Sequence, residues 1–239
     1  MNKTNTMVSS GFKSRPVYFL LALSFLIASC EKKWKKPTDV SFGFQLNSNS
    51  GSGLIKFTSG YILLDRIDFD GERKQGSNNV DFSKDYDPNV QIDLSTINLS
   101  SGIAFDIPQG TYTRIDLNVR TEEQQNSMPN LVIYGTYINT INDTLAVQFE
   151  FNSGESFEIT AQSSSGGNEI VLIEDQPSTT KIVFNPKYWF DVVPQSMLDS
   201  ANITIVNGVQ TIIVSENDNQ DIYQLAADRI RDGNQVIIN

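Results

Sequence analysis

The chain of 239 residues contains no histidine and a single cysteine, Cys30. The absence of histidine excludes Ser-His-Asp triads, Cys-His dyads and metal sites with imidazole ligands. A lone cysteine cannot form a disulfide within its own chain. A thiol nucleophile or a thiolate metal site would have to be built on this one cysteine. Carboxylate pairs, Ser-Lys dyads and tyrosines are the other common catalytic groups that remain.

Positive charge is scarce. The chain has 18 basic and 28 acidic residues, and the first 29 residues hold three of the basic residues and no acidic one. The remainder therefore has 15 basic and 28 acidic residues, a net charge of −13. Acidity of this size argues against nucleic-acid partners, since Lys and Arg must neutralise phosphates. It also argues against a broad basic face on an anionic membrane, and solubility is its simplest meaning.

Long hydrophobic runs are absent except for Val17–Ala28, which follows the basic residues Lys3, Lys13 and Arg15. This run is too short for a permanent membrane helix, which needs roughly 20 apolar residues. Positive charge, a short apolar run and small residues at its end are typical of a cleaved secretory signal. The sequence therefore predicts a signal peptide over residues 1–29.

The signal ends in Ile27-Ala28-Ser29-Cys30, which resembles the lipobox of bacterial lipoproteins. The resemblance implies cleavage between Ser29 and Cys30, a diacylglyceryl group on the Cys30 thiol, and acylation of the new amino terminus with a fatty acid such as palmitate. Each buried methylene contributes about 0.8 kcal/mol, so two or three chains hold a protein firmly. We expect a lipoprotein of the cell envelope, anchored to a bacterial membrane, with the outer membrane as the expected location.

Residues 30–39 form the expected lipidated tether, in which four lysines flank Trp34. Two interpretations are open. The lysines and Trp34 favour contact with anionic headgroups at a membrane interface; alternatively, the tether is a solvated linker. Some surface-exposed lipoproteins of the Bacteroidota carry an acidic stretch after the cysteine, and the basic tether differs from them.

Strand signals dominate from Val40 onward. Alternation of apolar and polar residues over Val40–Leu46 is typical of a half-buried strand. Further strands are predicted at 54–57, 61–69, 90–94, 131–138, 145–151, 156–162, 169–173, 179–185, 203–205 and 211–214. Residues 70–79 are expected to form a polar loop, and residues 80–89 to be irregular.

This spacing predicts a mainly β fold with one or two antiparallel β-sandwich domains and a short C-terminal helix. The polar stretch 121–130 is the best boundary candidate. It separates a β-sandwich domain at 40–125 from a second β-sandwich half or domain at 131–239.

The run Ile107-Pro108-Gln109-Gly110-Thr111-Tyr112, followed by alternating apolar residues to Val119, contains a Pro-Gln-Gly turn before a strand. It resembles secreted β-sandwich modules of the transthyretin and carboxypeptidase-regulatory type, and also uncharacterised lipoprotein families of the Bacteroidota. The resemblance covers about residues 40–120. It implies a sandwich and attaches no activity to it.

The C-terminal part contains helix signals. Pro194 fits the first turn of a short helix over 194–201, and an Asn207-Gly208 turn joins two strands. Asn219 is placed to cap a final helix over 220–231, whose apolar stripe is expected to pack on the sheet.

Acidic residues gather in the first half, and we expect them on loops. They are Asp65, Asp68, Asp70, Glu72, Asp81, Asp85 and Asp87. Carboxylate oxygens at this density are compatible with calcium, but their spacing is not that of an EF-hand. We favour solvated loop acids, and predict no metal site and no cofactor.

The aromatic cluster Tyr188-Trp189-Phe190 is the most prominent apolar group. Exposed, it would contact a ligand or partner by stacking. Buried, it would be core where the sheet meets a helix, and this is the interpretation we favour.

These observations predict a protein that is not an enzyme and has a binding or adhesion role, which requires an aromatic patch or an open sheet face. The alternative is a structural or accessory subunit of an envelope or surface assembly, which requires an exposed edge strand. A second alternative, a carboxylate-based glycan hydrolase, requires two convergent acids in a cleft. The expected partners are the membrane, through the lipid anchor, and an envelope protein or glycan.

Overall fold

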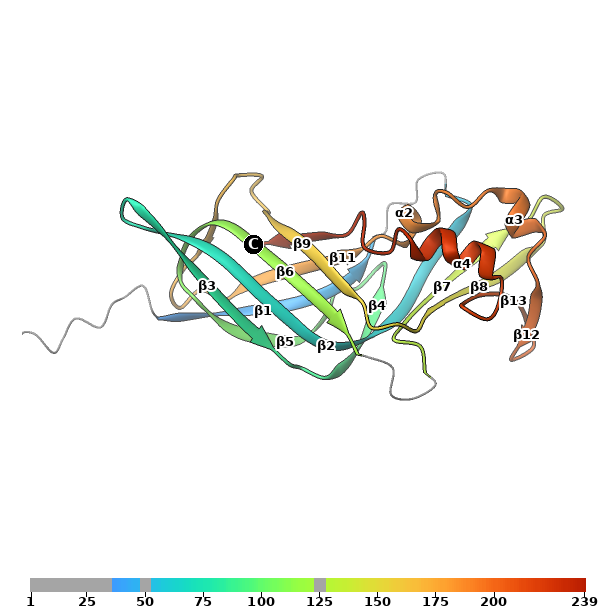
Figure 1. Ribbon diagram of the computed structural model, residues 1–239, viewed down its shortest axis with the longest axis horizontal. Coiled ribbons are helices and arrows are strands. Elements are labelled where there is room, and N and C mark those ends of the chain that lie inside the picture. The colour runs from blue at the N-terminus through green and yellow to red at the C-terminus, as the bar shows by residue number, and fades with distance from the viewer. Residues whose placement is uncertain (1–35, 48–52, 123–127) are drawn as a thin grey trace, which may run out of the picture. The chain divides into compact units, whose positions relative to one another are not determined.

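The computed structural model describes residues 36–47, 53–122 and 128–239. Ser29 and Cys30 and most of the tether lie outside these ranges. Residues Pro37–Asn239 form one compact unit (Figure 1). Its elements are β1 (Pro37–Leu46), β2 (Ile55–Gln75), β3 (Asn78–Tyr86), β4 (Val90–Ser95), β5 (Ser100–Pro108), β6 (Gly110–Thr121), β7 (Leu131–Ile138), β8 (Thr144–Phe151), β9 (Ser156–Ser163), β10 (Ile170–Leu172), β11 (Ser178–Phe184), α2 (Pro186–Phe190), α3 (Gln195–Asp199), β12 (Ile203–Val206), β13 (Val209–Val214), α4 (Gln220–Ala227) and β14 (Gln235–Ile238).

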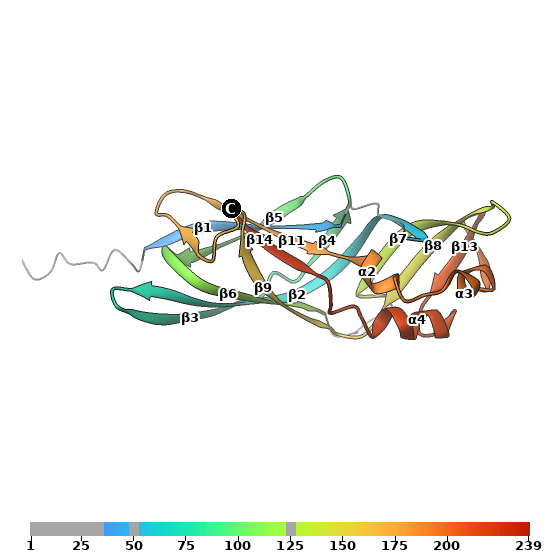
Figure 2. The ribbon, with the colours of Figure 1, turned by 90° about the horizontal axis from the view of Figure 1, so that it is seen from above.

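The predicted mainly β class is confirmed, and the strands belong to one large mixed sheet. Its order is β12-β13-β8-β7-β2-β6-β9-β14-β11-β1-β5, with β3 and β4 also paired to β2 and β10 to β6. Most neighbours are antiparallel, as expected for a sandwich. Three pairs are parallel: β1 with β11, β13 with β8, and β14 with β9. Figure 2 shows the same unit from above.

Strand β2, with 21 residues, is the longest of the described strands and pairs with four others. Strands β3 and β4 pair with it along one edge, and β6 and β7 along the other. Because β2 pairs with β7, and β1 with β11, strands from 40–125 and from 131–239 are neighbours in a single sheet.

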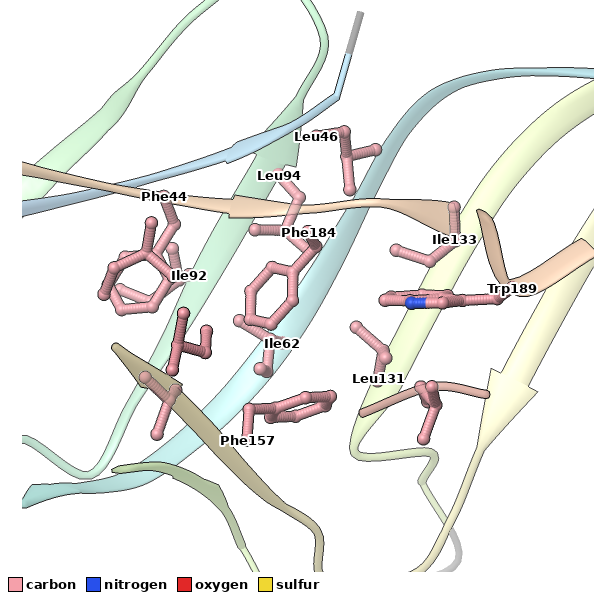
Figure 3. Close-up of a cluster of buried hydrophobic side chains, with 14 of the residues drawn as sticks. Phe44, Leu46, Ile62, Ile92, Leu94, Leu131, Ile133, Phe157, Phe184 and Trp189 are labelled. Carbon is pink, nitrogen blue, oxygen red and sulfur yellow. The ribbon is translucent and has the colours of Figure 1, made fainter. Parts of the chain in front are cut away.

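The core lies where the sheet folds over itself. Figure 3 shows side chains from β1, β2, β4, β7, β9 and β11 converging there. The rings of Phe44 and Phe184 have centroids 6.4 Å apart, and those of Phe157 and Phe184 are 5.1 Å apart. All three are fully buried. Burial of side chains of this size is the main stabilising term of such a fold, at about 25 cal/mol per Å² of apolar surface.

Helices α2 and α4 cover one face of the β7-β8-β13 part of the sheet. Phe149 on β8 contacts Phe190 on α2 at 5.3 Å, and Phe151 contacts Tyr223 on α4 at 6.0 Å. Helix α2 begins after Asn185, whose side chain accepts a hydrogen bond from the Tyr188 backbone N–H. No helix in the described part of the chain has the length and apolarity needed to cross a membrane.

Two expectations for residues 70–89 are wrong. The polar loop expected at 70–79 is the end of β2 and a tight turn into β3, with Gly76 at φ 65°. The stretch expected to be irregular, 80–89, is mostly strand β3. Strand β3 has largely exposed side chains, and the buried positions at this end of β2 are Gly71 and Arg73, so the alternation of apolar and polar residues that reveals a strand is weak.

The short helix expected near Pro194 is confirmed as α3, and Asn207 and Gly208 both have positive φ, as a two-residue hairpin turn requires. The final helix is shorter than expected and ends at Ala227. Strand β14 follows it and was not expected. The Asn219 side chain does not cap α4, because it bonds the Asn202 backbone and the Ile213 carbonyl instead.

Candidate functional site

The aromatic cluster singled out in the sequence lies on α2 and packs inward. Trp189 has no exposed surface, and its indole Nε1–H donates a hydrogen bond to the Asp232 carbonyl at 3.1 Å. Phe190 is buried against Phe57 and Phe149. Tyr188 is partly buried, with the Arg229 guanidinium 4.0 Å from its ring centroid. Trp189 and Phe190 therefore have a packing role and present no surface to a ligand.

The acidic residues expected on loops lie mainly on strands, which corrects that expectation. Asp65, Asp68, Asp70 and Glu72 belong to β2, Asp81 and Asp85 belong to β3, and Asp87 follows β3. Their inward neighbours Ile67 and Phe69 alternate with them and are buried. The acids thus line the outer face of a strand ribbon, where most of them are open to water, although one carboxylate oxygen of Asp68 is buried.

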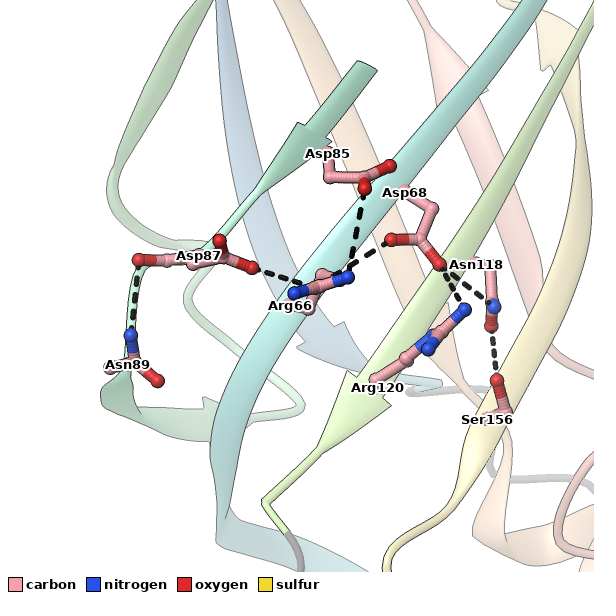
Figure 4. A network of polar contacts seen from close by, with 8 residues as sticks. All are labelled: Arg66, Asp68, Asp85, Asp87, Asn89, Asn118, Arg120 and Ser156. Atoms are coloured by element: carbon pink, nitrogen blue, oxygen red, sulfur yellow. Dashed lines mark hydrogen bonds and ion pairs between the residues drawn. The ribbon is translucent and has the colours of Figure 1, made fainter. Parts of the chain in front are cut away.

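Several of these carboxylates are held in the polar network shown in Figure 4. Arg66 Nε donates to Asp87 at 2.6 Å, and Arg120 Nη2 lies 2.7 Å from Asp68. Asn118 donates to the same Asp68 carboxylate at 3.1 Å, and Ser156 donates to Asn118 at 2.6 Å. The network joins neighbouring strands of the ribbon, and its hydrogen-bonding groups are largely used by one another.

Within the three described ranges, no group of three or more Asp, Glu, Cys or His residues is arranged to hold a metal ion. The hydrogen bond from Arg66 to Asp87, with the charges of Asp87, Asp85 and Asp68, raises the pKa of the Arg66 guanidinium. Asp68, Asp85 and Asp87 thus stabilise the charged guanidinium of Arg66.

A polar cavity of about 570 Å³ lies beside this network, lined in part by Asp65, Arg120, Glu122 and Glu155. Glu155 is buried, and its carboxylate accepts hydrogen bonds from Arg231. Its backbone N–H donates to the Thr121 hydroxyl at 2.7 Å. Glu155 therefore joins the end of β6 to the C-terminal segment. Its Oε1 atom already accepts from Arg231 and is not free to bind a ligand.

A different surface groups aromatic and polar side chains on one side of the sheet. On the face of β2, β7 and β8 opposite the helices, Tyr61 and Tyr134 are diagonal neighbours, because Tyr61 pairs with Val132 and Tyr134 with Ser59. Gln148 pairs with Tyr134 and Glu150 with Val132, so their side chains share this face. We call Tyr61, Tyr134, Gln148 and Glu150 the tyrosine face.

The tyrosine face is partly open to solvent. Tyr134 is 38% exposed, and Tyr61, Gln148 and Glu150 are half-buried. Gln148 Nε2 donates to the Glu150 carboxylate at 2.5 Å, which orients both side chains. Burial, with smaller contributions from Tyr134 and Glu150, raises the pKa of Tyr61, so its hydroxyl stays protonated and able to donate.

Sequence reasoning missed this face because both sides of β7 look apolar. Ile133 and Tyr137 point into the core, while Tyr134 and Ile138 point outward. The only available signal was the alternation of polar and apolar residues along a strand. In β7 this alternation is hidden, because aromatic and β-branched residues lie on both faces. Comparisons with protein-family models, with curated proteins and with solved structures give no match for this chain.

Proposed function

We propose that the protein is a lipoprotein of the bacterial cell envelope, anchored through lipid on Cys30, with a non-catalytic binding role. The lipobox and the basic start of the signal support the anchor. The tyrosine face supports the binding role, and we propose a neutral glycan as its ligand.

The observation that carries the binding role is the pair Tyr61 and Tyr134 on an uncovered sheet face. An aromatic ring offers a stacking surface to the apolar face of a sugar ring, and we take the contribution of stacked aromatic pairs, about 0.5–1.5 kcal/mol beyond simple burial, as the scale of such a contact. Gln148 and Glu150 lie beside the rings and offer both donors and acceptors to sugar hydroxyls. Rings and hydrogen-bonding groups on one flat face match the alternation of apolar and hydroxyl surfaces along a glycan.

Charge favours a neutral ligand over an acidic one. Glu150 belongs to the tyrosine face and Asp93 of β4 pairs with Tyr61, whereas the exposed Lys56 pairs with Thr136, in the row next to Tyr134. Two carboxylates beside the rings would repel uronic acids or phosphorylated glycans.

Titration calorimetry of the full-length protein with neutral polysaccharides and with peptidoglycan fragments tests the proposal. We expect Tyr134→Ala to weaken binding by about tenfold, the loss of one stacking contact of 1–1.5 kcal/mol. Tyr134→Phe keeps the ring and is expected to bind within about threefold of the parent. Val171→Ala, at an exposed residue of β10, which pairs with β6, is the control. Equal binding by Tyr134→Ala and the parent would refute the assignment of this face.

The accessory-subunit role is the second candidate, and a separate feature favours it. Strand β12 is the last strand of the sheet order and carries exposed isoleucines. Such an edge fits assembly with another envelope protein.

A further inference from the structure

Strand β12 presents an open backbone edge. It pairs with β13 through Val206↔Val209 and Thr204↔Thr211, and no described residue pairs with its other side. In a two-residue hairpin the residues that flank the turn exchange hydrogen bonds, and every second pair does so after that. The N–H and C=O groups of Ile203 and Ile205 therefore point away from β13.

This edge is also apolar. Ile203 is 49% exposed and Ile205 is 63% exposed, and Val209 across the hairpin is 53% exposed. Natural proteins protect such edges by keeping them short, or with charged residues, proline, bulges or a covering element. The four residues of β12, Ile-Thr-Ile-Val, contain no charged residue and no proline.

Two other edge strands, β3 and β5, carry such protection. Strand β3 carries Asp81, Lys84 and Asp85 along its length. Strand β5 pairs with β1 across a register shift, and it contains Gly102 at φ 139° and ends at Pro108. Strand β12 has none of the charges, bulge or proline found in β3 and β5, and of these devices it has only its short length of four residues.

The charge around β12 indicates the partner's chemistry. No lysine or arginine occurs between Lys187 and Arg229, whereas this stretch contains six acidic residues. Asn219, next to Asp218, bonds the backbone of Asn202 at the start of β12 and so places acidic chain beside the strand. The β12 region of a second copy would bring the same acids, so a basic segment is a better complement than β12 itself.

We propose that β12 accepts an extended, basic segment of another envelope protein as an additional strand. The main-chain groups of Ile203 and Ile205 provide the hydrogen bonds, and alternate apolar residues of the partner pack beside the two isoleucine side chains. This inference deepens the accessory-subunit role and is independent of glycan binding by the tyrosine face.

A direct test uses the full-length protein in detergent and a fluorescent peptide, Lys-Lys-Val-Thr-Val-Thr-Val-Lys-Lys, followed by anisotropy. Two control peptides accompany it: one has N-methyl groups on three successive central amides, and the other has glutamates in place of the lysines. We expect only the first peptide to bind well, because the others lack the strand-forming amides or the positive charge.

Two protein variants locate the site. Ile205→Pro removes an outward N–H without removing a bond to β13, and is expected to weaken peptide binding by about tenfold or more. Ile205→Lys places a charge on the edge, and is expected to reverse the preference toward the glutamate peptide. Val209→Thr changes the same hairpin away from the free edge and is expected to bind within about twofold of the parent.

Equal binding of the N-methylated peptide, or unchanged binding by both Ile205 variants, would overturn the proposal. Self-association of the parent that Ile205→Pro abolishes would also overturn it, by identifying a second copy as the occupant. Since Ile205→Pro leaves Tyr134 in place, retained glycan binding by this variant separates the failure of one proposal from that of the other.

Discussion

A hydrogen bond between Tyr137 on β7 and Asp199 on α3 joins the sheet to a helix. Tyr137 is fully buried on β7, and its hydroxyl donates to the Asp199 carboxylate at 2.5 Å. Asp199 also accepts a hydrogen bond from the Thr140 backbone at 3.3 Å. The Tyr137 hydrogen bond lowers the pKa of Asp199, and burial raises the pKa of Tyr137 to about 12.

This pair predicts a defined pH dependence. A carboxylate whose pKa is lower in the folded state than in the unfolded state stabilises the fold above the unfolded pKa of about 3.9. That contribution disappears as the pH falls through the lower, folded pKa. We therefore expect Tyr137→Phe to be less stable than the parent at pH 7, and this difference to shrink below pH 4. Urea unfolding at pH 7 and pH 3 measures it, and a difference independent of pH would contradict the assignment.

Trp189 is the residue whose truncation should cost most. Its ring contacts Phe149 and Phe184 in the core, and its Nε1–H is hydrogen-bonded. We expect Trp189→Ala to lower the free energy of unfolding by about 3–5 kcal/mol, as for other buried aromatic residues, and Trp189→Phe to lower it less.

A fluorescence measurement checks the burial of Trp189 independently. The chain has two tryptophans, so a Trp34→Phe background leaves the emission of Trp189 alone. The buried ring should be weakly quenched by acrylamide. Quenching as strong as in the unfolded chain would show that the ring is exposed.

Among the elements, the sequence predicted strands well where one face is buried. Val40–Leu46 and 145–151 alternate clearly, and both are strands of the structure. Strand β3 was missed because its side chains are mostly exposed and polar, so its conformation depends on pairing with β2. Tertiary pairing of this kind leaves little mark on the local sequence.

Strand β14 gives an element-scale prediction. It lies between β9 and β11, and Val236 on its inner face has no exposed surface. Val236→Asp would bury an unpaired carboxylate, and we expect it to destabilise the unit by about 4 kcal/mol or more. Gln235→Asp, at the exposed neighbour, should be nearly neutral. Thermal unfolding compares the two, and equal stability would show that β14 does not dock.

For the whole molecule, the mainly β class was predictable from the many short strand signals, but the pairing of strands was not. For example, β6 before the polar stretch 121–130 and β7 after it both pair with β2. The tyrosine face was likewise hidden, because Tyr61 and Tyr134 are more than seventy positions apart and meet only through that register.

The proposed anchor and the two proposed surfaces are compatible with one another in a single protein. Lipid on Cys30 would hold the acidic unit at a membrane, the tyrosine face would bind glycan, and β12 would join a partner strand. All of these depend on the protein being an envelope lipoprotein, which is the central claim.

Metabolic labelling with a palmitate analogue in a bacterial host, followed by mass spectrometry of the purified chain, tests that claim most directly. We predict a mature protein that begins at Cys30 and carries covalent lipid there, with no label on the Cys30→Ala variant. A parent chain that begins elsewhere or carries no lipid, or a Cys30→Ala variant labelled as strongly as the parent, would contradict it.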